Sequence, residues 1–308
     1  MLTQLGLRAA RYFVPPPNLR RQVWSERLRL ALMLGPALAV IVLLFLGGLA
    51  LAGLQSLGYL PFIGRTELSL AAYRTLLTGP DLYRSLLLSL WISLAATSIS
   101  TVLAVAAALL LRQNFYGRRW VTFIFQLNIP IPYLVGAIGV LFLFSQSGLA
   151  ARAAHLLHLI NGPADFPALV FDRYAIGIIL QFVWKATPFT GVIVLAALQS
   201  IGEDYEQAAQ TLGANRWQRF RYVLLPLILP GLLAASVLVF AFTFGAFEVP
   251  LLLGQRYPSA LPVLAYRYYT NADLNYRAEA MAVSLIITAI VTGLVFVYLK
   301  LSQKLGSR

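Results

Sequence analysis

The 308-residue chain contains no cysteine, which excludes disulfide bonds, thiolate metal sites and cysteine nucleophiles. It is also poor in charge, because only 11% of its residues are Asp, Glu, Lys or Arg, whereas 59% are hydrophobic. A soluble domain of this length carries far more charge than this. The apolar residues gather in long runs, and this predicts that lipid is the solvent for much of the chain.

Two further scarcities narrow the function classes. The chain has only two histidines, His155 and His158, and no matching ligands nearby, so a short interfacial helix is favoured over a metal site. It contains no Walker A sequence, G-x-x-x-x-G-K-[ST], so it is not expected to hydrolyse ATP. A membrane-embedded enzyme needs acids, histidines or a nucleophile that converge at one depth, and the sequence shows no such set. We therefore expect no enzyme, no resident cofactor and no metal.

Six apolar runs are long enough to cross a bilayer, because a hydrocarbon core of about 30 Å needs about 20 helical residues. An all-α membrane protein is the prediction, with a basic tail over residues 1–30 and a transmembrane domain over 31–308. The first run is longer than the apolar region of a signal peptide, which favours a retained span. The predicted spans are Ala31–Leu54, Ser85–Leu111, Trp120–Phe144, Tyr174–Leu198, Pro226–Leu253 and Glu279–Leu301.

The net charge of +13 is distributed unevenly between the connecting segments. Fifteen of the 24 basic residues lie in the N-terminal tail, the loop after the second span, the segment after the fourth span and the C-terminus. Eight lie on the opposite side of the membrane. By the positive-inside rule, both termini are cytoplasmic. The positive charge follows the membrane, so it requires no nucleic-acid partner.

The cytoplasmic segment 199–225, between the fourth and fifth spans, is unlike an ordinary loop. Ser200 and Glu203 have the spacing of a capping box, and Gly213 stands where a left-handed residue ends a helix. Asn215 then caps a second helical stretch that leads into Pro226. Two short helices joined by a glycine turn are therefore predicted. An amphipathic connector without a partner is the plainer alternative, and a DNA-reading helix-turn-helix is implausible between two spans.

The spacing within this segment carries a family resemblance. Gln207-Ala208-Ala209 is followed by three residues and Gly213, and nine residues later by Val223-Leu224-Leu225-Pro226. This resembles the EAA loop of the permease subunits of binding-protein-dependent ABC importers. Gln207 stands where the family usually has glutamate, and Glu206 would point about 100° away around a helix. The resemblance implies a type I importer permease fold and an ATPase-coupling role for Glu206, Gln207, Ala208, Ala209, Gly213, Arg216 and Pro226.

The resemblance also implies the partners of the chain. They are two cytoplasmic ATPase subunits that bind ATP and magnesium, a second permease subunit, identical or homologous, and an external solute-binding protein. The expected location is a bacterial inner membrane, and the expected mechanism is alternating access. A secondary transporter is the rival from another class. It would need inverted repeats and ion-coupling carboxylates at midplane, and no clear repeat is present.

Polar groups inside the membrane predict where a solute passes, because such groups usually face a cavity or a partner. Lys185 and Glu248 are ionisable residues within spans, and prolines interrupt the third and fourth spans nearby. An alternative is that Lys185 and Glu248 pair with each other or with the second permease. The residues expected to line the path are Gln126, Asn128, Trp184, Lys185, Thr187 and Glu248.

The stretch Phe244–Gly254 is similar to the fifth span of permeases for polyamines, ferric iron and thiamine, which favours a polyamine-like cation. Phosphonates, opines and sugars remain alternatives, since Glu248 suggests a cation and Lys185 an anion. The outer loop 255–277 is rich in tyrosine. This composition suits either a docking site for the binding protein or the lipid headgroup region.

Overall fold

The structure is a computed structural model, and it describes residues 19–201 and 204–306. The chain divides into two units, residues 1–54 and 55–308, which we describe separately. The first unit holds most of helix α2 (Leu19–Ser56), and the most apolar 18-residue window within Arg29–Ser56 has a mean hydropathy of 2.7. None of that window is buried, as expected of a span that faces lipid or another subunit. The predicted boundary after residue 30 falls inside α2, and residues 1–18 lie outside the described part.

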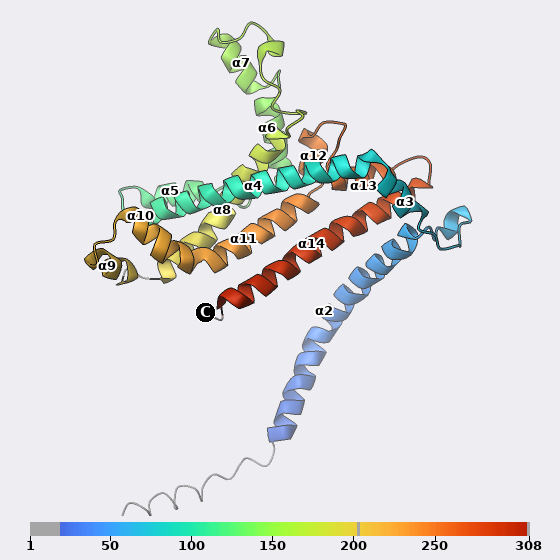
Figure 1. Ribbon diagram of the computed structural model, residues 1–308, viewed down its shortest axis with the longest axis horizontal. Helices are drawn as coiled ribbons and strands as arrows, with labels where there is room; N and C mark the ends of the chain where they lie inside the picture. Colours follow the sequence, from blue (N-terminus) through green and yellow to red (C-terminus); the bar gives the residue numbers. More distant parts are fainter. Residues whose placement is uncertain (1–18, 202–203, 307–308) are drawn as a thin grey trace, which may run out of the picture. The chain divides into compact units, whose positions relative to one another are not determined.

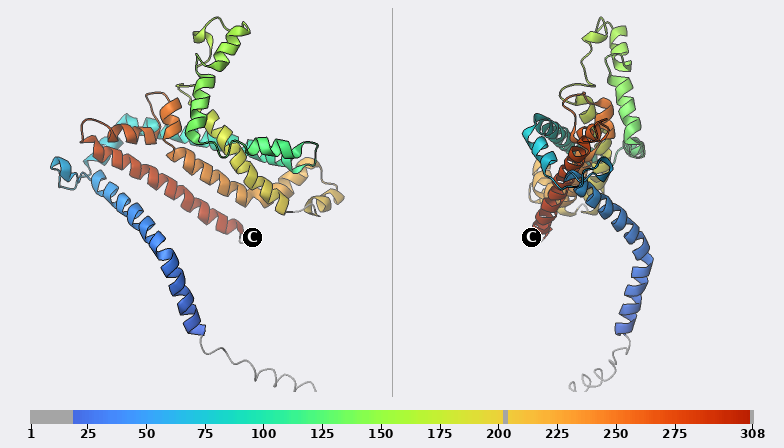
Figure 2. Two further views of the ribbon diagram at one scale, coloured as in Figure 1. Left: turned by 180° about the vertical axis from the view of Figure 1, so that it is seen from behind. Right: turned by 90° about the vertical axis from the view of Figure 1, so that its right-hand side faces the viewer.

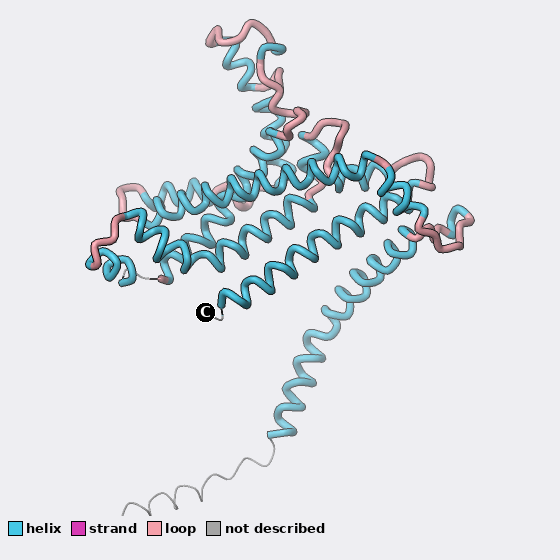
Figure 3. The backbone as a smooth tube through the Cα atoms, viewed as in Figure 1, coloured by secondary structure: helices cyan, strands magenta, loops and turns pink. Residues whose placement is uncertain are grey.

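The second unit contributes five more helical stretches of spanning length. The prediction of six spans in an all-α protein is confirmed, and the part of the chain that is described contains helices and loops but no strand (Figure 3). The five stretches are Pro80–Arg112, Tyr133–Leu156, Ile176–Ser200, Arg216–Gly245 and Tyr276–Lys300.

Helices α4 (Pro80–Arg112) and α8 (Ile176–Ser200) form the central pair of this unit. The face of α4 that is buried carries mostly small side chains, which let two helices approach closely in a membrane. These residues are Ser85, Ser89, Ser93, Ala96, Ser100, Ala104 and Ala108. On α8, Phe182, Val194 and Leu198 are fully buried. Helices α11 (Leu225–Gly245) and α14 (Tyr276–Gly306) run alongside the pair (Figures 1 and 2).

The third predicted span is not one helix. It is divided into α5 (Arg118–Gln126) and α6 (Tyr133–Phe144), and the segment between them contains Pro130 and Pro132. Proline lacks an N–H and clashes with the preceding helical turn, so two prolines in three residues end the helix. The prediction that prolines interrupt this span is confirmed, but its predicted bounds, 120–144, are wrong. The apolar span instead comprises α6 and the following α7 (Leu149–Leu156).

The fifth predicted span is shorter than expected. Helix α11 ends at Gly245, where Ala246 is extended, and α12 (Glu248–Leu253) is a separate short helix. The predicted range Pro226–Leu253 thus joined two elements. Shorter helices complete the unit: α3 (Ala71–Thr78) before α4, and α13 (Leu261–Tyr269) before α14. The remaining predicted spans match the structure within a few residues at most ends.

Candidate functional site

The cytoplasmic segment folds as two helical pieces around a glycine turn. Helix α9 (Asp204–Thr211) precedes the turn, and α10 (Arg216–Arg219) follows it, continuing through a π turn (Phe220–Leu224) into α11. Both pieces lie at the end of the bundle where α4 and α8 terminate (Figures 1 and 2). The π turn directly precedes Leu225 and Pro226. Single π turns occur frequently at functional positions in helices.

The turn between α9 and α10 has the predicted geometry. Gly213 has φ +81°, in the left-handed region that glycine adopts without steric cost. The Asn215 side chain accepts a hydrogen bond from the Gln218 N–H at 2.8 Å, and the Gln218 side chain accepts one from the Asn215 N–H at 2.8 Å. This reciprocal capping box confirms that Asn215 starts the second helix.

The predicted start of the first helix is wrong. Ser200 is the last residue of α8, and its hydroxyl donates a hydrogen bond to the Ala197 carbonyl at 2.8 Å instead of capping a new helix. The fourth span thus continues two residues past its predicted end at Leu198. Glu203, the other member of the proposed capping box, lies outside the described residues.

Large apolar side chains on this segment point into solvent. Leu212 is 88% exposed, Trp217 67% and Tyr205 59%, and Gln207 and Ala208 beside them are exposed as well. Contiguous exposed apolar groups of this kind mark interaction surfaces. We call these five residues the α9–α10 surface. Its place at the cytoplasmic end agrees with the motif positions, and its partner is considered below.

Glu206, the acid next to Gln207, has a partner within the chain. Its carboxylate forms an ion pair with Arg112, at the C-terminal end of α4, and both side chains are about four-fifths buried. Nearby, Arg219 donates a hydrogen bond to the Gln210 side chain at 3.3 Å, which links α10 to α9. These groups, together with the exposed Arg216, line a polar groove of about 610 Å³.

A second polar cluster lies where the broken third span meets α8. The Lys185 ammonium, only 6% exposed, donates hydrogen bonds to three backbone carbonyls in the α5–α6 connection. They are those of Asn128 at 2.5 Å, Ile129 at 2.8 Å and Ile131. Backbone groups at membrane depth must find partners within the protein. Lys185 therefore satisfies carbonyls at the proline break, of which that of Asn128 also accepts a hydrogen bond from the Ile131 N–H at 3.1 Å.

The same cluster supplies the hydrogen bond that is missing in α8 because proline has no N–H. Pro188 has no N–H, so the carbonyl of Trp184, four residues earlier, lacks its helical donor. The Asn128 side-chain amide donates to that carbonyl at 2.6 Å. Gly136 lets α8 side chains approach α6 closely, because a Cβ atom there would lie 2.3 Å from the Gln181 side chain and 2.9 Å from the Trp184 ring. Each of the two interrupted spans thus supplies the hydrogen bonds that the other lacks.

The structure separates the other residues proposed for the translocation path. Asn128, Trp184 and Lys185 come together, with Gln126 half-buried at the end of α5. Thr187 bonds within its own helix, to the Val183 carbonyl at 2.7 Å. Glu248, at the start of α12, is exposed and forms no ion pair with any described residue. Lys185 and Glu248 do not pair with each other. The path-lining role of these residues stays a prediction.

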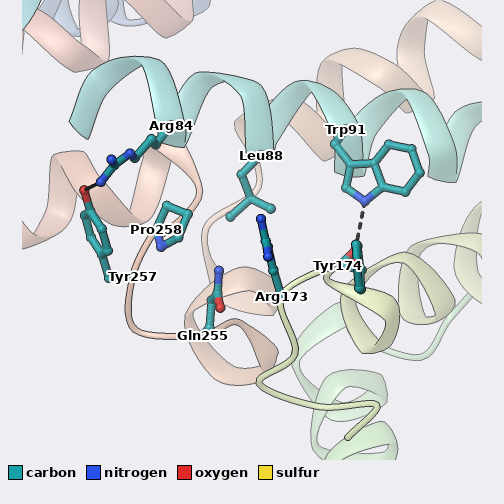
Figure 4. A pocket seen from close by; sticks show the side chains of 8 residues that line it. All are labelled: Arg84, Leu88, Trp91, Arg173, Tyr174, Gln255, Tyr257 and Pro258. Carbon is teal, nitrogen blue, oxygen red and sulfur yellow. Dashed lines mark hydrogen bonds between the residues drawn. The ribbon is translucent and has the colours of Figure 1, made fainter. Parts of the chain in front are cut away.

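At the opposite end of α4 lies a pocket of about 660 Å³ (Figure 4). Arg84 donates to the Tyr257 hydroxyl at 2.7 Å, and that hydroxyl donates to Asp81 at 2.7 Å. Trp91 and Arg173 line the same pocket. The sequence indicated only the tyrosine-rich loop. It gave no signal for the other residues, because Arg84 and Tyr257 are 173 positions apart.

Another tyrosine of this loop is electrostatically perturbed. Burial raises the pKa of the Tyr268 hydroxyl to about 12, and the negative charges of Asp81 and Glu279 add to the shift. The Tyr268 ring stacks on Tyr276 with their centroids 5.6 Å apart. The Tyr268 hydroxyl is therefore neutral, and its ring packs α13 against the start of α14. The two histidines show no metal-binding geometry, since no group of three potential ligands occurs among the described residues.

Comparison with known proteins places this six-span chain in a family. The family model for the binding-protein-dependent transport system inner membrane component matches residues 100–305. A trehalose/maltose transport system permease protein of Thermococcus litoralis is 26% identical over 79% of this chain and 80% of its own length. A sulfate transport system permease protein of Salmonella typhimurium is also 26% identical, over 79% of this chain and 84% of its own.

Among solved structures, a bacterial alginate ABC transporter in complex with an alginate pentasaccharide-bound periplasmic protein has a similar chain, with a TM-score of 0.75. The match covers 93% of this chain and 98% of that one, at 21% sequence identity, and shows that the two share a fold. The six spans, the cytoplasmic helix–glycine–helix segment and the family match agree. The chain belongs to the inner-membrane components of binding-protein-dependent transport systems, the multi-pass permease subunits of ABC importers.

Proposed function

We propose that this permease receives its energy through the α9–α10 surface, which docks on a separate cytoplasmic ATPase. The observation that carries the proposal is the exposure of Leu212 and Trp217 on a rigidly capped turn at the cytoplasmic end of the bundle. Exposing such large apolar side chains is costly unless a partner covers them. Two ATPase subunits bind ATP and magnesium and move this segment as they close, and a second permease completes the path.

Co-purification tests these partners directly. The chain, expressed with the genes beside its own and purified by a tag on this subunit, is expected to bring down an ATPase and a second permease. Mass spectrometry identifies and counts them. A stable chain that carries no ATPase would contradict the proposal. The external binding protein is expected to bind the assembled complex at the side that carries the Arg84 pocket.

For the solute, we propose a polyamine-like cation delivered by that binding protein. The Phe244–Gly254 stretch suggested this class, while Lys185 argued for an anion. Burial of the Lys185 ammonium against three carbonyls supports the cation, because it weakens the case for an anion. Glu248 is left exposed and unpaired with any described residue. The relatives named above carry trehalose/maltose and sulfate, so sugars, oxyanions, ferric iron and thiamine are the competing classes.

Neutralising Glu248 tests the cation proposal. In proteoliposomes that contain the whole importer and its binding protein, Glu248→Gln is expected to lower spermidine uptake about 10-fold, the size of one charge-assisted contact. Stimulation of ATP hydrolysis by the binding protein should persist. Glu67→Gln, at an exposed acid on the same side of the membrane, is the control and should transport normally. Wild-type importer that takes up sulfate or a disaccharide but no spermidine would refute the cation.

A further inference from the structure

The ion pair between Arg112 and Glu206 joins helix α4 to helix α9 of the cytoplasmic segment. Glu206 belongs to α9, which is part of the proposed ATPase surface, and Arg112 is the last residue of α4. The side chains are only 18% and 22% exposed, so water screens this contact less than it screens a surface pair. Glu206, the acid next to Gln207 of the motif, thus forms its ion pair within the chain.

Helix α4 runs without interruption from this contact to the external pocket. Its 33 residues extend from Pro80 to Arg112, about 50 Å at a rise of 1.5 Å per residue. Near its other end, α4 supplies Arg84 and Trp91 to the pocket in Figure 4. One rigid helix therefore has the coupling segment at one end and an external recognition pocket at the other.

Helix α9 has two further connections. The chain joins it to α8, and the glycine turn and the bond between Arg219 and Gln210 join it to α10 and so to α11. The route through α8 also reaches the Arg84 pocket, because Arg173 and Tyr174 line that pocket just before α8 begins. The ion pair is a direct side-chain link from α9 to the helix that lines that pocket.

We propose that the Arg112–Glu206 pair fastens α9 to α4, so that α4 carries movement between the ATPase surface and the external pocket. Arg112 and Glu206 are positioning residues that contact neither ATP nor solute. The inference rests on the proposed ATPase docking and adds a defined route to it. Movement of α9 displaces the end of α4, and docking at the Arg84 pocket biases α9 in return, since coupling between two sites is reciprocal.

The test uses the complete complex in proteoliposomes, with the binding protein purified together with its native solute as the probe. Arg112→Glu and Glu206→Arg are each expected to reduce the stimulation of ATP hydrolysis by the binding protein about 10-fold, a usual size for coupling between two sites. In the Arg112→Glu variant, co-purification of the ATPase and the basal rate of hydrolysis should stay within twofold. The double variant, which reverses the pair, should regain most of the stimulation.

Arg119→Glu is the matched control. It makes the same charge change in the same cytoplasmic loop region, at an exposed arginine, and should behave as wild type. The natural absence of cysteine allows a second measurement. Arg112→Cys combined with Glu206→Cys should lose the stimulation and regain it when a bifunctional thiol reagent cross-links the two sulfurs.

The results separate the two proposals. Single variants that keep full stimulation, a reversed pair that stays inactive, or a cross-link that restores nothing would overturn the link while leaving ATPase docking intact. Variants that lose the ATPase itself would show that the pair serves assembly and not transmission. Failure of the wild-type chain to bind any ATPase would remove the proposed function and, with it, the link.

Discussion

Replacement of Lys185 by methionine is expected to prevent the chain from accumulating as a folded protein. Methionine is similar in length but donates no hydrogen bond, so the carbonyls of Ile129 and Ile131 lose the donor that Lys185 supplies, and the Asn128 carbonyl keeps only the Ile131 N–H. An unsatisfied buried polar group costs roughly 1–3 kcal/mol, so two such groups together destabilise by at least about 2 kcal/mol. The measurements are the yield of monodisperse protein in detergent and its thermal unfolding midpoint.

The same variant separates two roles for Lys185. If its charge lined the translocation path, Lys185→Met would fold normally and only its transport kinetics would change. Lys300→Met, at an exposed lysine near the end of the last span, makes the identical change and should fold as wild type. A Lys185→Met chain with normal yield and unfolding midpoint would show that the three hydrogen bonds do not hold the broken span.

Substitution of Gly213 by valine is expected to abolish co-purification of the ATPase. A side chain in the left-handed conformation costs about 1–2 kcal/mol, and a β-branched residue fits there least well. The chain relieves this strain by opening the turn, which separates Leu212 from Trp217 and divides the α9–α10 surface. At least a 10-fold fall in the ATPase recovered per tagged chain is the expected result. Asparagine tolerates this backbone conformation, so Gly213→Asn should retain most of the binding.

Gly117 provides a matched control for backbone strain. It has φ +84° in the cytoplasmic loop before α5, and a Cβ atom there would meet no other atom within 4 Å, as at Gly213. Gly117→Val therefore introduces comparable strain outside the coupling segment and should keep the ATPase. Equal losses in the two valine variants would attribute the effect to general instability. Normal binding by Gly213→Val would show that the turn is dispensable for docking.

Local patterns in the sequence were sufficient for several of these features. The left-handed Gly213 and the Asn215 cap depend on residues within a few positions of each other, and both were predicted correctly. The number of spans followed from the length of the apolar runs. The break in the third span was predicted from Pro130 and Pro132, but the bounds drawn from hydropathy, 120–144, were wrong, because the apolar span runs over Tyr133–Leu156.

The contacts that the sequence did not reveal join distant positions. Lys185 lies 54 to 57 residues from the carbonyls that it binds, and Arg112 lies 94 residues from Glu206. The sequence drew attention to Lys185 as a charge within a span and to Glu206 as an acid next to the motif position. Their partners, however, are backbone carbonyls for Lys185 and an arginine on another helix for Glu206. A backbone carbonyl has no distinguishing letter in a sequence. The structure was therefore needed to find the three carbonyls that Lys185 binds.

The bond pattern of Lys185 also bears on how the protein enters the membrane. A lysine at the centre of a helix opposes insertion by about 2.5–3.5 kcal/mol when the helix partitions alone. The carbonyls that accept its hydrogen bonds are synthesised more than 50 residues earlier. We therefore expect the third and fourth spans to insert into the membrane together, because the segment before α6 supplies hydrogen-bond acceptors for Lys185 of the fourth span. A ribosome-bound chain that lacks residues 127–132 should therefore integrate its lysine-bearing span less efficiently than the intact chain.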